Sequence, residues 1–363
     1  MKTILFIYNG ECFKLPPFLT ILDALCNEFE LKVISYETMG NLRKLQEIYG
    51  NKVEFYNVER EYLSNNLFDR AKRKVKRIFK FKTKYYIETE KKINKIQYDK
   101  LWIIHESTLN EIQSLLLGKK YIFSMYELND TNRKFLDCIK NPIINADKVI
   151  VAEYNRANIL RVWLKLNKTP FVVPNKPFNH PRKKCIQTDK IDESKFGKII
   201  LYQGHIQETR GLDIICEAVN SLNGYTLLLM GSHTTYRDEL QKKYSNVKIV
   251  DFVNPPEHLY ITSHAYIGIV TYNFVSLNGI YCAPNKTYEY AGFGIPMIAN
   301  NIPGLKNTIG FFNAGECVDF SNVTDIKNAI IKIDSNYSQY VEGANKFYDD
   351  IDIKCLLLNI LND

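Results

Sequence analysis

The sequence has no CxxC pair, because its eight cysteines are scattered along the chain. This distribution argues against a disulfide framework or a zinc site and fits a reducing cytoplasm. No apolar run reaches the roughly 18 residues that a membrane-spanning helix requires. The N-terminal segment MKTILFIYNG turns polar without a small-residue cleavage site, which indicates a first strand and not a signal peptide.

Low-complexity tracts and nucleic-acid-binding motifs are also lacking, and 45% of the residues are hydrophobic, as in globular proteins. The net charge of +8 is unevenly distributed, because residues 67–84 contain nine lysines and arginines with apolar residues at helical spacing. The pattern predicts a basic amphipathic helix suited to an anionic membrane surface, with a solvated basic face as the alternative. Without an accompanying motif, we do not expect a nucleic-acid partner.

Strand-like and helix-like patterns alternate over residues 1–178 and again over residues 198–340. Short apolar runs followed by amphipathic segments indicate parallel sheets with helices on both faces. The polar stretch 179–197 lacks apolar periodicity and is the predicted linker. Residues 341–363 are predicted to form a helical tail that packs back on the first domain. The expected fold class is α/β, with two doubly wound, Rossmann-like domains facing a central cleft.

An anion site is predicted where the first strand of the second domain ends, in LYQGHIQETRG. Gly204 lies between strand and loop, where the missing side chain lets the backbone approach a ligand. Arg210 stands at the start of the next helix, and both its guanidinium and the helix N-terminus suit phosphate. Glycine-rich turns are common in α/β folds, so this motif alone leaves an ordinary structural turn open.

A second anion site is predicted in APNKTYEYAGFGIP, residues 283–296. Asn285 and Lys286 fall at the N-terminus of a predicted helix, and the carboxylate of Glu289, one turn further, suits the vicinal hydroxyls of a sugar. The alternative is a surface ion pair between Lys286 and Glu289, which are three residues apart. Two anion sites and a hydroxyl-binding carboxylate together predict a nucleoside diphosphate as the ligand.

Four motifs follow one another in the second domain: G-x5-R-G, LLLMGS, VKIVDFV and APNKTYEYAGFGIPMIANNIPGL. Their order resembles that of family-4 retaining glycosyltransferases of the GT-B fold. It is most similar to bacterial enzymes that build surface polysaccharides such as capsule and lipopolysaccharide. The resemblance covers residues 198–310, and the first half only in its alternation. It implies a hexosyltransferase that uses a nucleotide-diphosphate sugar with retention and needs no metal or other cofactor. If the acceptor is a glycan growing on polyprenyl diphosphate, it lies at the cytoplasmic face of the membrane, and the basic stretch 67–84 predicts a peripheral enzyme that docks there.

Carried over residue by residue, the resemblance supplies a predicted donor site. Its members are Gly204, His205, Arg210, Phe252, Val253, Asn285, Lys286 and Glu289. By resemblance, Gly204, Arg210 and Lys286 contact the diphosphate, and Glu289 holds the ribose. Phe252 and Val253 take the place of the segment that holds the base. Arg210 and Lys286 are the predicted catalytic pair, because cations stabilise a departing diphosphate without a metal.

Several positions depart from the family pattern. His205 replaces an arginine of many members, and Tyr281 stands where a first glutamate belongs, eight residues before Glu289. Tyr126 stands where the first domain of related enzymes often places a histidine. The acceptor-side candidates are Gly10, Tyr126 and Glu127, together with His105 as a catalytic candidate at the end of a strand.

Two other functions stay open from the sequence. A nucleotide-sugar epimerase shares the double fold but needs carboxylates and histidines facing the sugar from both domains. A non-catalytic binding protein is favoured by the missing first glutamate and by Tyr126. The Asp350-Ile-Asp352 spacing lies in the tail, and we interpret it as a solvated acidic patch and not a metal-binding loop.

Overall fold

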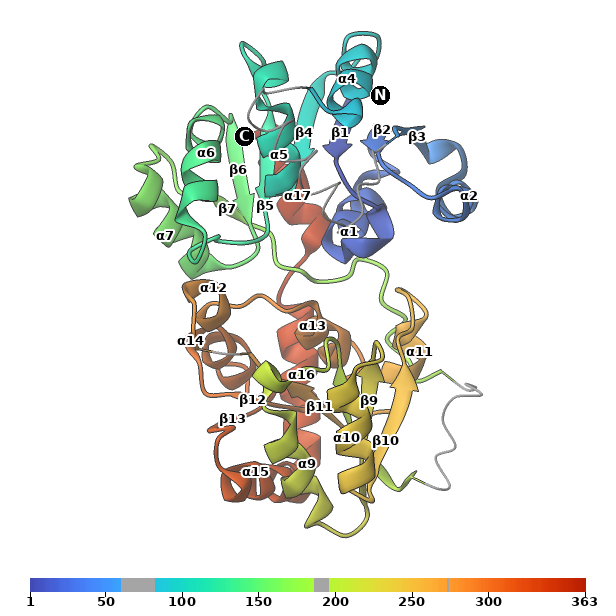
Figure 1. Ribbon diagram of the computed structural model, residues 1–363, viewed down its shortest axis with the longest axis vertical. Coiled ribbons are helices and arrows are strands. Elements are labelled where there is room, and N and C mark those ends of the chain that lie inside the picture. The colour runs from blue at the N-terminus through green and yellow to red at the C-terminus, as the bar shows by residue number, and fades with distance from the viewer. Residues whose placement is uncertain (60–81, 186–195, 273) are drawn as a thin grey trace. The chain divides into compact units, whose positions relative to one another are not determined.

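The computed structural model describes residues 1–59, 82–185, 196–272 and 274–363. They divide into two compact units: unit 1 contains Met1–Val173 with Leu357–Asp363, and unit 2 contains Pro174–Leu356. Each unit has a parallel sheet flanked by helices (Figure 1). The predicted α/β class with two Rossmann-like sheets is therefore confirmed.

The sheet of unit 1 has the strand order β3-β2-β1-β4-β5-β6-β7, and every neighbouring pair is parallel. Its strands are β1 (Thr3–Tyr8), β2 (Glu30–Ser35), β3 (Val53–Asn57), β4 (Lys100–Ile104), β5 (Ile122–Met125), β6 (Lys148–Val151) and β7 (Phe171–Val172). Its helices are α1 (Pro16–Leu25), α2 (Met39–Tyr49), α4 (Lys84–Ile93), α5 (Glu106–Ile112), α6 (Arg133–Ile144) and α7 (Tyr154–Leu164), with the end of α17 (Ile353–Asn362). Strand β1 is buried along its whole length, as expected for a central strand covered on both faces.

The sheet of unit 2 has the order β10-β9-β8-β11-β12-β13, again parallel throughout. Its strands are β8 (Lys198–Gln203), β9 (Tyr225–Gly231), β10 (Val247–Asp251), β11 (Ile267–Val270), β12 (Met297–Asn300) and β13 (Gly315–Val318). Its helices are α9 (Leu212–Asn220), α10 (Thr235–Lys243), α11 (His258–Thr262), α12 (Leu277–Ile280), α13 (Asn285–Ala291), α14 (Pro303–Leu305), α15 (Val323–Ser335) and α16 (Tyr337–Asp349). Two buried apolar clusters form its core.

The chain passes to unit 2 earlier than the sequence suggested. Residues 174–178 group with unit 2, where the Asn175 side chain donates to the carbonyl of Ala283 at 2.7 Å. Helix α16 also packs within unit 2, and only Leu357–Asp363 groups with unit 1. There the Lys148 ammonium donates to the carbonyl of Ile360 at 2.6 Å.

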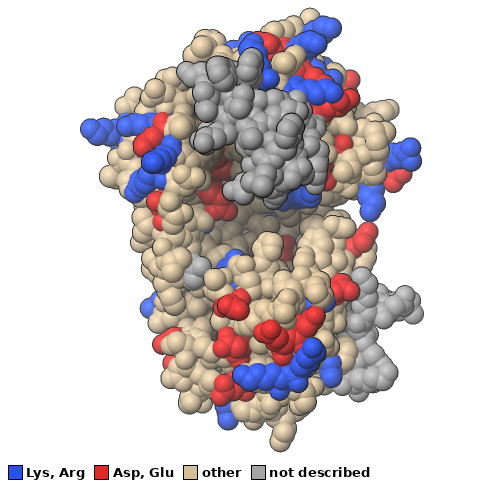
Figure 2. Space-filling model, in the orientation of Figure 1, with Lys and Arg blue, Asp and Glu red and all other residues tan. Residues whose placement is uncertain are grey.

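Charge on the described surface is mixed. Acidic and basic side chains are interspersed on the visible face of unit 2 (Figure 2). The predicted basic helix 67–84 lies outside the described residues except for its end, where Lys82 pairs with Glu90 at 3.0 Å and Lys84 with Glu59. Within the described ranges, no helix combines the length and apolar character needed to cross a bilayer.

Strand order fixes where each unit can hold a ligand. In unit 1 the strands are added outward from β1 to β3, and the chain then returns to place β4 on the other side of β1. In unit 2 the same change in the order of strand addition occurs between β8 and β11. Ligands of open parallel sheets bind beyond the carboxyl ends of the strands at such a switch point. The loops that follow β8 and β11 are therefore the first place to look in unit 2.

Candidate functional site

The loop after β8 passes close to β9, and two glycines make this possible. Gly204 has φ +134°, a backbone conformation that residues other than glycine rarely adopt. A Cβ at Gly231, the last residue of β9, would lie 2.2 Å from the carbonyl oxygen of Gly204. A Cβ at Gly204 itself would lie 3.1 Å from Nζ of Lys286. The space that a side chain of residue 204 would occupy is therefore bordered by the ammonium of Lys286, which belongs to α13.

Lys286 lies in the first turn of α13 and reaches the end of β8. Its Nζ donates to the carbonyl of Gln203 at 2.6 Å and lies 4.6 Å from the ring centre of Tyr202 and 5.9 Å from that of Tyr272. Burial, and after it the charge of Arg210, lower the pKa of Lys286 to about 7. A bound anion would oppose both effects and favour the charged ammonium.

Arg210 approaches the same place from the loop before α9. Its guanidinium carbon lies 4.7 Å from the ring centre of Tyr272, and Nη1 donates to the carbonyl of Thr271 at 3.2 Å. The Thr271 hydroxyl returns a hydrogen bond to the carbonyl of Arg210 at 2.9 Å. Among the described residues, buried Nε of Arg210 has no hydrogen-bond partner. Arg210 and Lys286 therefore share the Tyr272 ring at the switch point, where two adjacent cations suit a diphosphate.

Glu289 is buried, with 7% of its surface exposed. One carboxylate oxygen lies 3.2 Å from Nε2 of His258, and the other accepts from the side-chain amide of Gln203. Burial acts to raise the pKa of Glu289, but His258, Lys286 and Gln203 together hold it below its ordinary value. The alternative of a surface ion pair between Lys286 and Glu289 is wrong, because this carboxylate is buried and paired elsewhere.

The tyrosines of the α13 segment fix that helix in place. Tyr290 is fully buried and donates to the carbonyl of Leu201 in β8 at 2.9 Å. The imidazole of His180 lies 3.0 Å from the carbonyl of Glu289, while its other nitrogen accepts from the backbone N–H of Arg182. Burial lowers the pKa of His180 to about 4, so this ring is neutral and donates to the Glu289 carbonyl. These bonds hold Lys286 and Glu289 in register with β8.

The other predicted donor residues lie at ends of the same elements. Phe252 and Val253 follow β10, where Phe252 is 56% exposed and Val253 is buried. Asn285 is the first residue of α13, after Pro284. His205 is exposed, and its carbonyl accepts from the Tyr202 hydroxyl at 2.7 Å. Because parallel strands end at one edge, the structure places the predicted donor residues along the carboxyl edge of unit 2.

In unit 1, the acceptor candidates follow β1, β4 and β5, which are neighbours in the sheet. His105 has φ +75° and caps α5, accepting from the backbone N–H of Ser107 at 3.1 Å. Its ring centre lies 6.3 Å from those of Tyr8 and Tyr126. Gly10 is two residues beyond Tyr8, and a Cβ there would lie 2.5 Å from the Tyr8 ring.

A buried glutamate that we did not predict organises this edge. Glu106 is 1% exposed, and one oxygen accepts from the backbone N–H groups of Tyr126 and Glu127. Its other oxygen lies 3.3 Å from Nδ1 of His105. Burial raises the pKa of Glu106 above its ordinary value, although His105 acts to lower it. Glu106 thus links three of the predicted acceptor residues.

Sequence reasoning missed four residues of these sites: Gln203, His258, Tyr272 and Glu106. Gln203 could have been found, because it directly precedes Gly204 at the end of a strand. His258 and Tyr272 carry no local signal, since their partners are distant in sequence. Asp352, read as part of an acidic patch, accepts from the backbone N–H of Cys355 at the start of α17. Within the described residues, no group of three or more His, Cys, Asp or Glu side chains could hold a metal ion.

The paired parallel sheets are those of the GT-B fold of glycosyltransferases. Residues 197–336, which lie within unit 2, match the family model described as "Glycosyl transferases group 1". Unit 2 is therefore similar to group 1 glycosyl transferases, and its match includes the glycine, arginine, lysine and glutamate described above. No curated protein matches the chain.

Several solved structures have a similar fold. HepE from Anabaena, in complex with UDP-glucose, is 12% identical, with a TM-score of 0.73 over 100% of this chain and 99% of that chain. Sucrose-phosphate synthase from Thermosynechococcus elongatus is 14% identical, with a TM-score of 0.70 over 100% and 98%. A putative UDP-N-acetylglucosamine 2-epimerase from Listeria monocytogenes is 13% identical, with a TM-score of 0.61 over 99% and 96%. At these identities the likeness establishes the fold alone.

Proposed function

We propose that this protein is a hexosyltransferase that moves a sugar from a nucleoside-diphosphate donor to a growing bacterial surface glycan. The observation that carries the proposal is the pair of cations, Lys286 and Arg210, on the Tyr272 ring beside Gly204. The pair lies at a sheet switch point, within the segment that matches group 1 glycosyl transferases. A donor of this chemical class is also supported by the fold shared with HepE, which was solved in complex with UDP-glucose.

The proposed chemistry needs stabilisation of the leaving diphosphate. As the sugar–phosphate bond breaks, negative charge grows on the phosphate oxygens, and preorganised cations lower the energy of that state. Lys286 and Arg210 supply two such cations, and Gly204 lets the backbone approach the phosphates. In our proposal the acceptor hydroxyl oxygen bonds to the anomeric carbon on the same face from which the phosphate departs, so configuration is retained, and the departing phosphate oxygen takes the hydroxyl proton. Lys286 and Arg210 stabilise the leaving diphosphate in place of a metal.

We assign the donor to unit 2 and the acceptor to unit 1. The remaining donor groups are Glu289 for the ribose and Phe252 with Val253 for the base. His105, Tyr126, Glu127 and Gly10 are the proposed acceptor contacts. The carrier of the glycan is proposed to be a polyprenyl diphosphate at the inner face of the membrane.

A donor screen tests this function. The protein is incubated with UDP-, GDP- and CDP-sugars, with and without polyprenyl-diphosphate-linked glycan, and products are separated by mass spectrometry. We expect sugar transfer that requires an acceptor. An epimerised donor formed without acceptor would favour the epimerase, whose fold this chain shares. Absence of calorimetric binding to any of the three nucleoside diphosphates would favour a non-catalytic binding protein.

The membrane part of the proposal rests on the sequence of residues 67–84. Each lysine or arginine near an anionic surface contributes about 1 kcal/mol, so several of the nine would suffice for salt-sensitive binding. We expect binding to vesicles that contain anionic lipid and no binding to neutral ones. Replacing Arg73, Lys76, Arg77 and Lys80 with glutamate should abolish it and leave nucleotide binding unchanged. A wild-type protein that ignores anionic vesicles at low salt would refute this part alone.

A further inference from the structure

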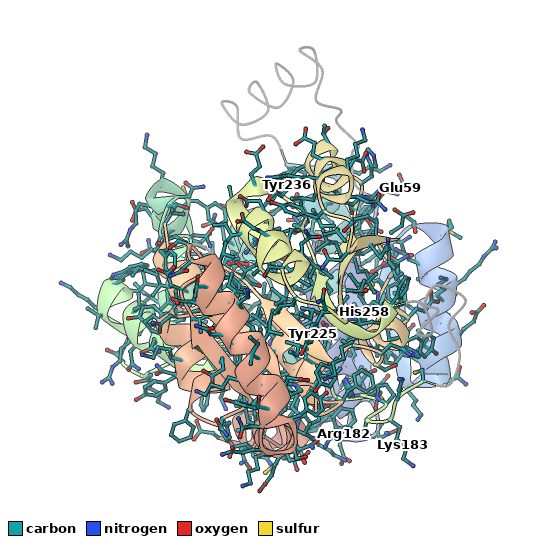
Figure 3. All side chains as sticks on the ribbon, turned by 90° about the horizontal axis from the view of Figure 1, so that it is seen from below. Glu59, Arg182, Lys183, Tyr225, Tyr236 and His258 are labelled. Atoms are coloured by element: carbon teal, nitrogen blue, oxygen red, sulfur yellow. The ribbon has the colours of Figure 1, made fainter. Side chains whose placement is uncertain are left out.

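The Glu289 carboxylate is held from two sides by residues outside the predicted donor site. Nε2 of His258 lies 3.2 Å from Oε1, and the amide of Gln203 donates to Oε2. The Thr262 hydroxyl donates to Oε1 of Gln203 at 2.8 Å, which orients that amide with its N–H toward Glu289. A buried hydrogen-bonded chain therefore joins α11, the end of β8 and α13. His258 is labelled in Figure 3.

The Glu289 carboxylate has enough free hydrogen-bond acceptor positions to bind a diol. A carboxylate has about four lone-pair directions, two on each oxygen. His258 and Gln203 occupy one on each, so each oxygen keeps one for a ligand. The 2′ and 3′ hydroxyls of a ribose require two neighbouring acceptors of this kind. Because Glu289 is only 7% exposed, its orientation depends on the residues that hold it.

Burying His258 costs folding free energy, and its contact with Glu289 is the interaction that can offset this cost. The His258 side chain is 12% exposed, and its buried Nδ1 has no hydrogen-bond partner among the described residues. Burying an unsatisfied polar atom destabilises a fold, and an apolar side chain would avoid that cost. The interaction that His258 makes instead is with the Glu289 carboxylate, whose pKa it lowers against the effect of burial.

We propose that His258 is a positioning residue for ribose recognition, which fixes the Glu289 carboxylate so that both of its remaining acceptor positions can bind the vicinal hydroxyls of a donor nucleotide. The inference rests on the proposed function, because it requires a nucleotide ligand. In this role His258 does not touch the nucleotide. Its effect is transmitted through Glu289, with Gln203 holding the second oxygen.

Two amide variants separate positioning from structure. His258→Gln places an amide nitrogen near the position of imidazole Nε2, whereas His258→Asn places it near Nδ1, too short to reach Glu289. Both keep a polar side chain at the same buried position. Calorimetry measures the Kd of wild type and variants for UDP, CDP and GDP and for their 2′-deoxy forms. His233→Asn is the control, because His233 is an exposed histidine of the same unit that pairs with Asp238.

We expect wild type to prefer the ribonucleotide by roughly tenfold or more, since one hydrogen bond to a charged group is lost in the deoxy form. His258→Gln and His233→Asn should keep this preference. In His258→Asn the preference should fall to within about twofold, because the ribonucleotide loses both hydroxyl contacts with Glu289 whereas the deoxynucleotide has only the 3′ contact to lose. An unchanged preference in His258→Asn, its loss in folded His258→Gln, or equal weakening of both nucleotides would overturn the inference.

The same titrations distinguish this inference from the function on which it rests. A wild type that binds nucleotides without preferring ribose keeps the proposed function and refutes the role of His258. A wild type that binds none of the three nucleoside diphosphates refutes both. Thermal unfolding of each variant shows whether a loss of preference occurs in a folded protein.

Discussion

Two buried glutamates, one in each unit, have pKa values displaced in opposite directions. Glu106 in unit 1 has a raised pKa because burial outweighs its contact with His105. Glu289 in unit 2 has a lowered pKa because His258, Lys286 and Gln203 together outweigh burial. The two glutamates are similarly inaccessible, at 1% and 7% exposure, so the partners and not the burial decide the direction of the pKa shift.

The same contrast extends to the two sheet edges. Both units have a doubly wound topology with a switch point, between β1 and β4 and between β8 and β11. Beside its switch point unit 2 has two cations on one tyrosine ring. Unit 1 has a histidine, tyrosines and glutamates, and its buried Arg156 donates to the carbonyl of Tyr126 at 2.6 Å. The fold fixes where a ligand can bind, and the side chains at that edge decide its charge. This difference favours the proposed assignment of an anionic donor to unit 2 and a hydroxyl-bearing acceptor to unit 1.

The largest expected effect comes from removing the cations of unit 2. Lys286→Met and Arg210→Met should each lower kcat by about 10²–10³, because a preorganised charge facing the leaving diphosphate is lost. Both should also weaken nucleoside-diphosphate binding in calorimetry. Lys306→Met is the charge-matched control, because Lys306 is an exposed lysine of the same unit. If it lowers kcat as much as Lys286→Met does, the effect is not local to the switch point.

Thr287 stands beside Lys286 in the sequence but would be a poor control for these variants. It is 2% exposed, and its hydroxyl donates to the carbonyl of Pro284 at 2.8 Å. Its replacement by alanine would remove a bond that fixes the start of α13. An effect of that variant would therefore say nothing about diphosphate binding.

On the unit 1 side, His105→Ala should lower the rate of sugar transfer by about 10², because a contact that positions the acceptor is lost and misplacement of a reactant by about 1 Å can cost that much. Nucleoside-diphosphate binding should be unchanged, because the donor groups lie in unit 2. Transfer assays and calorimetry on one preparation compare the two quantities. Equal losses of transfer and donor binding would contradict the division of roles between the units.

A smaller effect is expected from filling the open side of the Gly204 loop. Gly204→Ala forces a side chain into a positive-φ conformation beside Lys286, and such strain costs about 1–3 kcal/mol. The melting temperature should fall and diphosphate binding should weaken. Gly40→Ala in α2 is the matched control, because a Cβ there meets nothing within 4 Å. Gly40 is the second residue of α2, so the replacement should be neutral or stabilising by less than the ~1 kcal/mol typical of helix interiors.

Proton uptake on binding tests the charge state of Lys286. With a pKa of about 7, most of the Lys286 population is neutral in the free protein at pH 8, and a bound diphosphate favours the ammonium. Binding at pH 8 should therefore take up a fraction of one proton, and binding at pH 5.5 nearly none from this group. Calorimetry in buffers of different ionisation enthalpy measures the uptake. Proton uptake that persists in Lys286→Met would have to come from another group.

The smallest effects are expected from the pH dependence of stability, which tests the glutamate comparison directly. A raised folded-state pKa means that Glu106 opposes folding as pH rises above the unfolded-state value near 4.5. Relative to wild type, Glu106→Gln should gain stability between pH 4.5 and 7. The lowered pKa of Glu289 gives the opposite sign: its contribution is present above pH 4.5 and is lost as pH falls further. Urea unfolding across pH 3–7 measures both, and equal signs would contradict the comparison.

The local patterns of the sequence were enough to predict the sheet class, and they also supplied the candidate anion-binding residues. Apolar runs alternating with amphipathic helices leave little choice but parallel sheets, because each element must bury one face or both. Gly204, Arg210 and Lys286 stand next to strand or helix ends, where backbone geometry already favours anions. The unit boundaries were harder to predict, because the residues before the linker join unit 2 through hydrogen bonds to residues distant in sequence, such as that from Asn175 to Ala283.

By itself, the sequence determined which residues could bind a diphosphate and at which ends of which elements they stand. Only the tertiary structure decided that Lys286 and Arg210 meet on one tyrosine ring, that Glu289 is buried, and that His258 holds its carboxylate. The physical reason is that periodicity and capping signals act over a few residues. Side-chain partners, and the pKa shifts that they cause, depend on which strands become neighbours.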